Sequence, residues 1–300
     1  MLGSKNISVT LIILVSLLEL GCSDAQAPLI DEAPTALCAQ RRIEGEYIIK
    51  YTNRGFHRRK LSPESLDSAR HDPAVEWVEP NYRLPTETGV SRNWTYVINP
   101  GYLRLIGAEQ AQLKGIRGSG LTVGSVDWRH PRESVATIQE IAPEIKFATT
   151  DLQMPTQNEF HALVAIRESI RRGARIIDVG AMSGCSKAMR RSLESWQNLD
   201  VIFVHNGQGE GLTQEHLENF IDAGPYNLST ALLTGALALA WSSHPEMKSR
   251  AIISAYSNSE RCDERSRTLQ LNVPSLLYEV QKASLQPQEM TMRSSFANMR

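Results

Sequence analysis

The segment LTVGSVDWRHPRESVATIQEIAPEIKFATT (121–150) predicts a strand, a helix and a second strand in succession. Residues 121–127 form a short apolar run that is typical of a buried strand, and residues 144–150 form another strand-like run. Between them, residues 131–141 begin with a proline, which suits the first turn of a helix. Two strands joined by a helix in this way are expected to pair in parallel.

The alternation of strands and helices continues along the chain. Further strands are expected at 175–182 and 201–205, and further helices at 158–173, 186–198, 213–222, 229–241 and 245–256. The segment STALLTGALALAW (229–241) consists almost entirely of small and apolar residues, so its helix is expected to be buried. Repeated strand–helix units predict an α/β fold whose parallel β-sheet is flanked by helices on both faces.

A smaller unit precedes this α/β domain. GEYIIKYT (45–52) and AVEWVEPNYRL (74–84) predict strands, and Pro80 is expected to end the second strand. Between them, Ser62 stands directly before a proline, which is a typical start for a helix over 61–73. The unit is therefore expected to be a small α+β domain.

The N-terminal residues predict export. Lys5 is followed by an apolar stretch, the arrangement of a signal peptide that is removed from the mature protein. The stretch ends in Leu20-Gly21-Cys22, which resembles a bacterial lipobox with Cys22 as the lipidated residue. Ala25-Gln26-Ala27 offers an ordinary signal-peptidase site instead, so both a cell-envelope lipoprotein and a secreted protein remain open. The expected organisation is a signal peptide (1–22), a tether (23–41), the α+β domain (42–86), the α/β domain (94–282) and a tail (283–300).

The composition of the chain excludes several classes of function. Hydrophobic residues make up 41% and charged residues 22% of the chain, and the formal net charge is −1. A chain so nearly neutral has no electrostatic basis for binding nucleic acid, and it is expected to meet a membrane only through a lipid anchor. No two of the four cysteines have metal-ligand spacing, so no metal site is expected.

Several segments, in the same order along the chain, resemble the subtilisin-like serine proteases (subtilases). DPAVEWVEPNY (72–82) resembles the last strand of their inhibitory propeptide, and IGAEQAQLKGIRGSGLTVGSVD (106–127) is similar to the approach to their catalytic aspartate. Further similar segments are GARIIDVGAMSG (173–184), VIFVHNGQGEG (201–211) and TALLTGALALAWSSHP (230–245). The resemblance implies a shortened subtilisin-like domain preceded by a propeptide-like domain. A calcium ion is implied by the resemblance alone, and no other cofactor is expected.

The same resemblance implies a set of site residues. Asp127 stands at the position of the catalytic aspartate, and His130 lies one residue before the position of the catalytic histidine. Asn227 occupies the position of the nucleophilic serine, and Ser229 lies two residues beyond it. Asn206 is one residue away from the position of the oxyanion-stabilising asparagine. An asparagine cannot be deprotonated to attack a carbonyl group, although it is a good N-cap for a helix.

The displaced site favours a catalytically inactive pseudoprotease that acts by binding a protein or peptide partner. Without self-cleavage, the propeptide-like segment 42–84 is expected to stay attached and to remain in the cleft. One alternative is a serine endopeptidase with a rearranged triad of Asp127, His130 and Ser229, in which the histidine serves as base and the aspartate orients it. The other alternative is a structural envelope lipoprotein that uses the fold only as a globular body.

Overall fold

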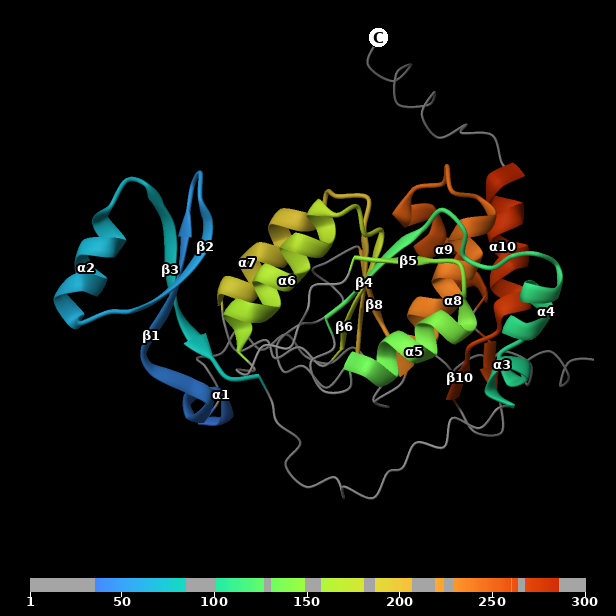
Figure 1. Ribbon diagram of the computed structural model, residues 1–300, viewed down its shortest axis with the longest axis horizontal. Helices are drawn as coiled ribbons and strands as arrows, with labels where there is room; N and C mark the ends of the chain where they lie inside the picture. Colours follow the sequence, from blue (N-terminus) through green and yellow to red (C-terminus); the bar gives the residue numbers. More distant parts are fainter. Residues whose placement is uncertain are drawn as a thin grey trace, which may run out of the picture.

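Figure 1 shows a computed structural model of the chain. The structure describes residues 36–84, 101–126, 131–148, 158–180, 187–206, 219–223, 229–259, 261–263 and 268–285. Cys22, Asp127, His130 and Asn227 lie outside these ranges. Within them, no helix combines the length and the apolar character needed to cross a membrane.

The centre of the molecule is a parallel β-sheet, as the sequence predicts, and it has five strands. Its strands are β4 (Thr122–Ser125), β5 (Lys146–Phe147), β6 (Ile176–Gly180), β7 (Ile202–His205) and β8 (Phe220–Asp222), arranged in the order β5-β4-β6-β7-β8. The ladder places Val123 opposite Ile176 and Val204 opposite Ile221. The central strands β6 and β7 are buried at every residue because both faces of the sheet are covered.

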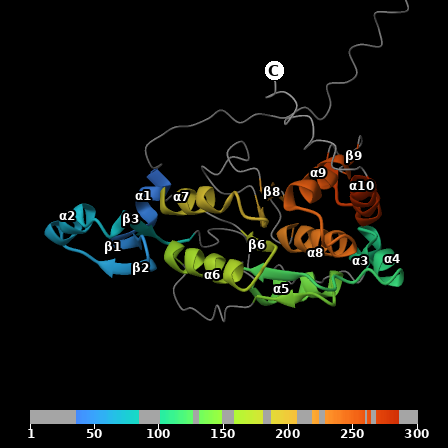
Figure 2. The same ribbon diagram turned by 90° about the horizontal axis from the view of Figure 1, so that it is seen from above.

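Helices cover both faces of this sheet (Figures 1 and 2). The helices beside it are α5 (Pro131–Ile141), α6 (Glu159–Arg171), α7 (Lys187–Trp196) and α8 (Ser229–Ser243). Ile141 of α5 and Leu237 of α8 share one core with Val204 of β7. Leu163 of α6 shares the other core with Phe203. Successive residues of a strand point to opposite faces, so α5 and α8 cover one face and α6 and α7 the other.

Helix α8 is the central helix of its face, as its small apolar residues predict. Every residue from Thr230 to Trp241 is buried except Leu232. Gly235 lets α5 approach closely, because a side chain at this position would lie within 3.0 Å of Ile141. Outside α8 lie α3 (Tyr102–Leu105), α4 (Ala108–Leu113), α9 (Ser249–Ser259) and α10 (Val273–Leu285), together with the hairpin of β9 (Arg261–Asp263) and β10 (Thr268–Gln270).

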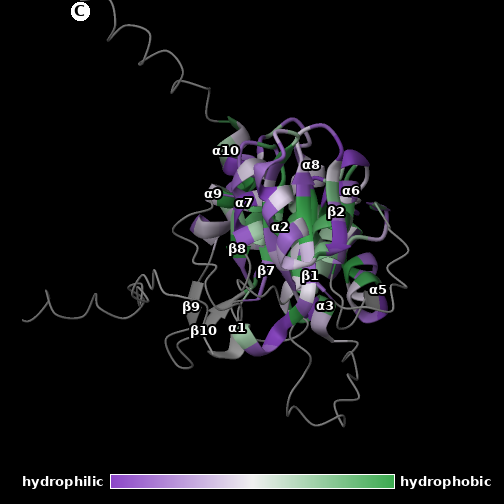
Figure 3. Ribbon diagram, turned by 90° about the vertical axis from the view of Figure 1, so that its left-hand side faces the viewer, coloured by the Kyte–Doolittle hydropathy of each residue, from purple (hydrophilic) through white to green (hydrophobic). Residues whose placement is uncertain are grey.

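The N-terminal residues form a small lobe on the side of α6 and α7 that faces away from the central sheet (Figure 1). Its elements are α1 (Ala36–Arg41), β1 (Arg42–Tyr51), β2 (Gly55–Lys60), α2 (Pro63–His71) and β3 (Val75–Tyr82). The three strands form an antiparallel sheet in the order β2-β1-β3. Ser62 is the N-cap of α2 and accepts a hydrogen bond from the backbone N–H of Ser65 (3.2 Å). Figure 3 shows α2 mainly in the colour of hydrophilic residues, and none of its residues is buried.

Several expectations for local structure are corrected. Pro80 does not end its strand, because β3 continues through it to Tyr82. The expectation of a helix at 213–222 is wrong for the residues that the structure describes there, because Phe220–Asp222 form β8. Strand β2 and helix α1 were not expected, and α1 lies within the segment expected to be a tether.

Candidate functional site

The candidate site lies at the carboxyl edge of the parallel sheet. Strands β4, β6, β7 and β8 all end at this edge, and α8 begins beside it. In open parallel sheets, this edge is where ligands bind. Asp127 and His130 stand between β4 and α5 in the sequence and lie outside the described residues.

Ser229 and Asn206 are the predicted site residues that the structure describes. Ser229 is the first residue of α8 and is partly buried. Asn206 directly follows β7, and its backbone N–H donates to the carbonyl oxygen of Gly180 (3.2 Å). The Asn206 side chain is almost fully buried, and its Oδ1 accepts no hydrogen bond within the described part of the chain. Leaving such an acceptor unsatisfied is costly, which makes Asn206 a position of interest at this edge.

A base for Ser229 is not supplied by the described histidines. His205 ends β7, but it points to the face opposite α8, since Val204 packs in the core of α8. His161 lies on α6, which covers that opposite face, and His244 follows the far end of α8. The remaining described histidines lie in the lobe. A histidine base for Ser229 would come from outside the described ranges, where His130 and His216 lie.

Two buried ionisable residues were missed in the sequence analysis. Asp178 of β6 is fully buried, and its Oδ1 accepts the backbone N–H of Gly180 (3.0 Å). Burial lowers the pKa of His205, while the charge of Asp222 acts in the opposite direction. Both residues interrupt apolar strand segments, RIIDVG and VIFVH, and a charged or titratable residue in such a strand is the signal that could have identified them.

The lobe reaches the carboxyl edge through the end of β3. Arg83 forms an antiparallel bridge with Asn158, the N-cap residue of α6. Asn81 is fully buried, donates to Glu46 (2.6 Å) and accepts from the backbone N–H of Phe160 (3.3 Å). Leu84, the last described residue of the lobe, is 4% exposed. The lobe is therefore fixed at the start of α6, beside the edge where the candidate site lies.

The lobe shares a hydrophobic core with the sheet. Phe56 of β2 contacts Trp77 of β3 (ring centroids 5.9 Å apart) and Trp196 of α7 (6.3 Å). Phe56, Trp77 and Leu84 belong to the same buried cluster as Leu163 of α6. At the rim of this contact, Arg191 of α7 lies 3.4 Å from Glu79 of β3. Apolar contact is thus the main attraction between the lobe and the sheet.

Glu79→Gln is expected to raise the free energy of unfolding at neutral pH by about 1 kcal/mol. Burial raises the pKa of Glu79, and the charges of Arg191, Lys187 and Arg70 offset this only in part. A carboxyl group whose pKa is raised on folding contributes stability below its unfolded pKa and loses that contribution as the pH rises through the folded value.

Thermal unfolding of wild type and Glu79→Gln at neutral pH and at a pH of about 4 tests this expectation. The difference between the two proteins should shrink at the lower pH. Arg191→Gln is the matched control, and it should destabilise the protein at neutral pH because Glu79 loses its counter-charge. A loss of stability in Glu79→Gln at neutral pH would contradict the expectation.

Metal binding finds no support among the described side chains. No group of three or more His, Cys, Asp or Glu residues in the described ranges is arranged to hold a metal ion. The calcium ion implied by the family resemblance is therefore assigned to no residues here.

Comparison with known proteins identifies the fold. No protein-family model matches the chain, and no curated protein matches it. Among solved structures, fervidolysin from Fervidobacterium pennivorans, a keratinolytic enzyme related to subtilisin, has a TM-score of 0.52 and 12% sequence identity. The match covers 84% of this chain and 62% of fervidolysin. This chain therefore has a shortened subtilisin-like fold, whereas the low identity transfers no activity or residue role.

Two further solved structures are similar at a lower level. The prenylagaramide maturation protease PagA has a TM-score of 0.42 and 14% identity, with 58% of this chain and 98% of PagA covered. MycP1 from Mycobacterium smegmatis has a TM-score of 0.41 and 12% identity, with 66% of this chain and 89% of MycP1 covered.

Proposed function

We propose that this chain is an exported protein with a subtilisin-like fold that acts by binding a protein or peptide rather than by cleaving one. In this proposal the lobe is never removed and permanently covers the carboxyl edge of the sheet. The observation that carries the proposal is the docking of the lobe, with Leu84 buried and Arg83 paired to Asn158 beside that edge.

The arrangement of the site residues supports the absence of cleavage. By resemblance, Asn227 occupies the position of the nucleophile, and it has no ionisable proton to give up. Ser229 is the first residue of a buried helix, where a serine commonly serves as a cap or first-turn residue. The described histidines lie on other faces or in the lobe, so a triad depends on His130 or on another residue outside the described ranges.

A serine endopeptidase is the second candidate, with Asp127 as the orienting carboxylate, His130 as the base and Ser229 as the nucleophile. The observation in its favour is that β4 ends, and α8 begins, at one edge of the sheet. A structural lipoprotein anchored through Cys22 is the third candidate. It differs from the first in having no specific partner, so a pull-down from an envelope extract separates the two.

The mass of the intact protein tests the proposal. A chain that begins at Ser23 is refolded and incubated, alongside the same chain with Asp127→Ala and with Ser229→Ala. All three are expected to keep their full mass, because the proposal gives this chain no working triad. A wild-type product that begins near residue 85, absent from both variants, would establish the endopeptidase instead.

A further inference from the structure

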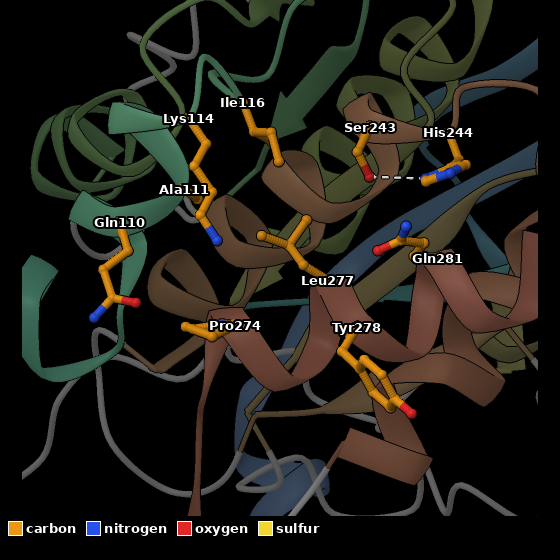
Figure 4. Close-up of a pocket in the computed structure, with 10 residues that line it drawn as sticks. All are labelled: Gln110, Ala111, Lys114, Ile116, Ser243, His244, Pro274, Leu277, Tyr278 and Gln281. Carbon is orange, nitrogen blue, oxygen red and sulfur yellow. Dashed lines mark hydrogen bonds between the residues drawn. The ribbon is translucent and has the colours of Figure 1, made fainter.

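A cavity lies far from the candidate site, between α4, the end of α8 and α10 (Figure 4). Its volume is about 330 Å³. The cavity is lined by Ser243, the last residue of α8, whereas Ser229 begins the same helix at the carboxyl edge. At 1.5 Å per residue, the two ends of α8 are about 21 Å apart. The cavity is therefore separate from the site described above.

The cavity has an apolar floor and a polar rim. Ile116, Pro274 and Leu277 provide the apolar surface. Figure 4 shows the side chains of Lys114 and Gln281 directed toward Leu277 from opposite sides. An occupant with both an apolar part and a polar part would match this lining.

Lys114 gives the rim a positive charge. None of the described residues that line the cavity is acidic. Lys114 is exposed and forms no ion pair within the described ranges, whereas the nearby bases Arg104 and Lys282 are each paired, with Glu109 and Glu279 respectively. A carboxylate on the occupant would supply the missing counter-charge.

His244 is held in place at the rim. The hydroxyl of Ser243 donates its one proton to the carbonyl oxygen of Ala240 (2.6 Å). Ser243 Oγ also lies 3.0 Å from Nδ1 of His244, a contact in which the ring nitrogen donates or accepts according to its tautomer. This fixes the orientation of the imidazole beside the cavity and leaves Nε2 as its second polar atom.

Exposed apolar side chains extend the cavity along α10. Tyr278 is 63% exposed and Leu285 is 76% exposed, and both follow the same face of the helix as Pro274 and Gln281. From Pro274 to Leu285 this face is about 16 Å long. Leu113 of α4, beside Lys114, is 83% exposed. Such a concentration of exposed apolar surface is typical of a binding surface.

The cavity between α4, the end of α8 and α10 and the exposed face of α10 beside it together form a groove. We propose that this groove binds a peptide segment of a partner protein in which a carboxylate stands next to an aliphatic or aromatic side chain. The carboxylate pairs with Lys114, and the apolar side chain enters the cavity over Leu277. The length of the apolar face on α10 favours an extended segment over a compact small molecule. The proposal goes beyond the function proposed above, since it holds whether or not the carboxyl edge can cleave peptides.

Selection of short random peptides displayed on phage tests the proposal, with the whole chain as bait. The tightest peptides are expected to carry an acidic residue beside an apolar one. Their affinity, measured by fluorescence anisotropy, should fall about tenfold in Lys114→Glu and by a similar factor in Tyr278→Ala. Both side chains are exposed, so these variants should fold normally. Lys60→Glu, the same charge change on the lobe, is the matched control and should bind as the wild type does.

A charge swap provides the decisive comparison. Replacing the acidic residue of the peptide by lysine should weaken binding to the wild type and restore binding to Lys114→Glu. The proposal is overturned if the selected peptides bind Lys114→Glu and Tyr278→Ala as tightly as they bind the wild type. It is also overturned if sedimentation shows that the wild type self-associates and that Tyr278→Ala abolishes this, because the occupant would then be a second copy of the chain.

Discussion

Arg175→Ala is expected to lower the free energy of unfolding by about 3 kcal/mol. The guanidinium of Arg175 donates to Asp200 (2.9 Å) and to the carbonyl oxygens of Pro245 (2.5 Å) and Met247 (2.8 Å). It also stacks on the ring of Trp241, with its central carbon 3.9 Å from the ring centroid. One side chain thus joins the start of β6 to the chain after α8. Its loss takes the donor from the carbonyl oxygen of Pro245, and it removes one of two donors from Met247 and from Asp200, which keep Trp241 Nε1 and the backbone N–H of Ser249.

The carboxylate of Asp200 extends this contact to the next helix. Burial acts to raise the pKa of Asp200, but hydrogen bonds from Ser249 and the charge of Arg175 bring it below its usual value. The backbone N–H of Ser249, the first residue of α9, donates to Asp200 (2.6 Å). A carboxyl group with a lowered pKa contributes stability above its unfolded pKa and loses that contribution as the pH falls through the folded value.

Urea unfolding followed by circular dichroism measures the effect of Arg175. The difference between wild type and Arg175→Ala should shrink below a pH of about 4, as Asp200 becomes protonated. Arg175→Lys is the control: it keeps the charge but cannot reach three acceptors at once, so an intermediate loss is expected. If Arg175→Ala unfolds at the same urea concentration as the wild type, the contact carries no net stability.

The central strands of the sheet could be predicted because they are buried on both faces and therefore form short apolar runs. Strand β8 could not, because Phe220–Asp222 are held by pairing with β7, a partner distant in the sequence. The expectation that Pro80 ends its strand was wrong for a related reason. It lies in β3, an edge strand of the lobe, where the missing N–H of proline can face away from the ladder.

The candidate site was predicted only in outline. The places of Ser229 at a helix start and Asn206 at a strand end follow from the alternation of strands and helices. The face to which a side chain points depends on the register of the sheet, which no local pattern records. His205 illustrates this: it follows Val204 by one residue, and that single step directs it away from α8.

Phe56→Ala is expected to destabilise docking of the lobe by about 3 kcal/mol. Phe56 begins a row of aromatic rings that runs through Trp196 and Phe203 to Phe220, with neighbouring centroids 6.3, 6.4 and 4.8 Å apart. The row connects β2 of the lobe, through α7, to the central sheet. Because the lobe and the sheet share this core, the wild type should unfold in a single transition.

In Phe56→Ala, the lobe should separate from the sheet before the rest of the molecule unfolds. Trp77 and Trp196 at the contact contribute to the tryptophan fluorescence together with three other tryptophans, so the fluorescence should begin to change at a lower urea concentration than circular dichroism. Tyr51→Ala, which truncates a lobe aromatic outside the shared core, is the control and should keep the two transitions coincident. An unchanged single transition in Phe56→Ala would mean that the aromatic row does not hold the lobe. If the lobe covers the carboxyl edge, as we propose, the expected separation would uncover that edge without any cleavage, so that undocking of the lobe and its cleavage from the chain could be measured independently.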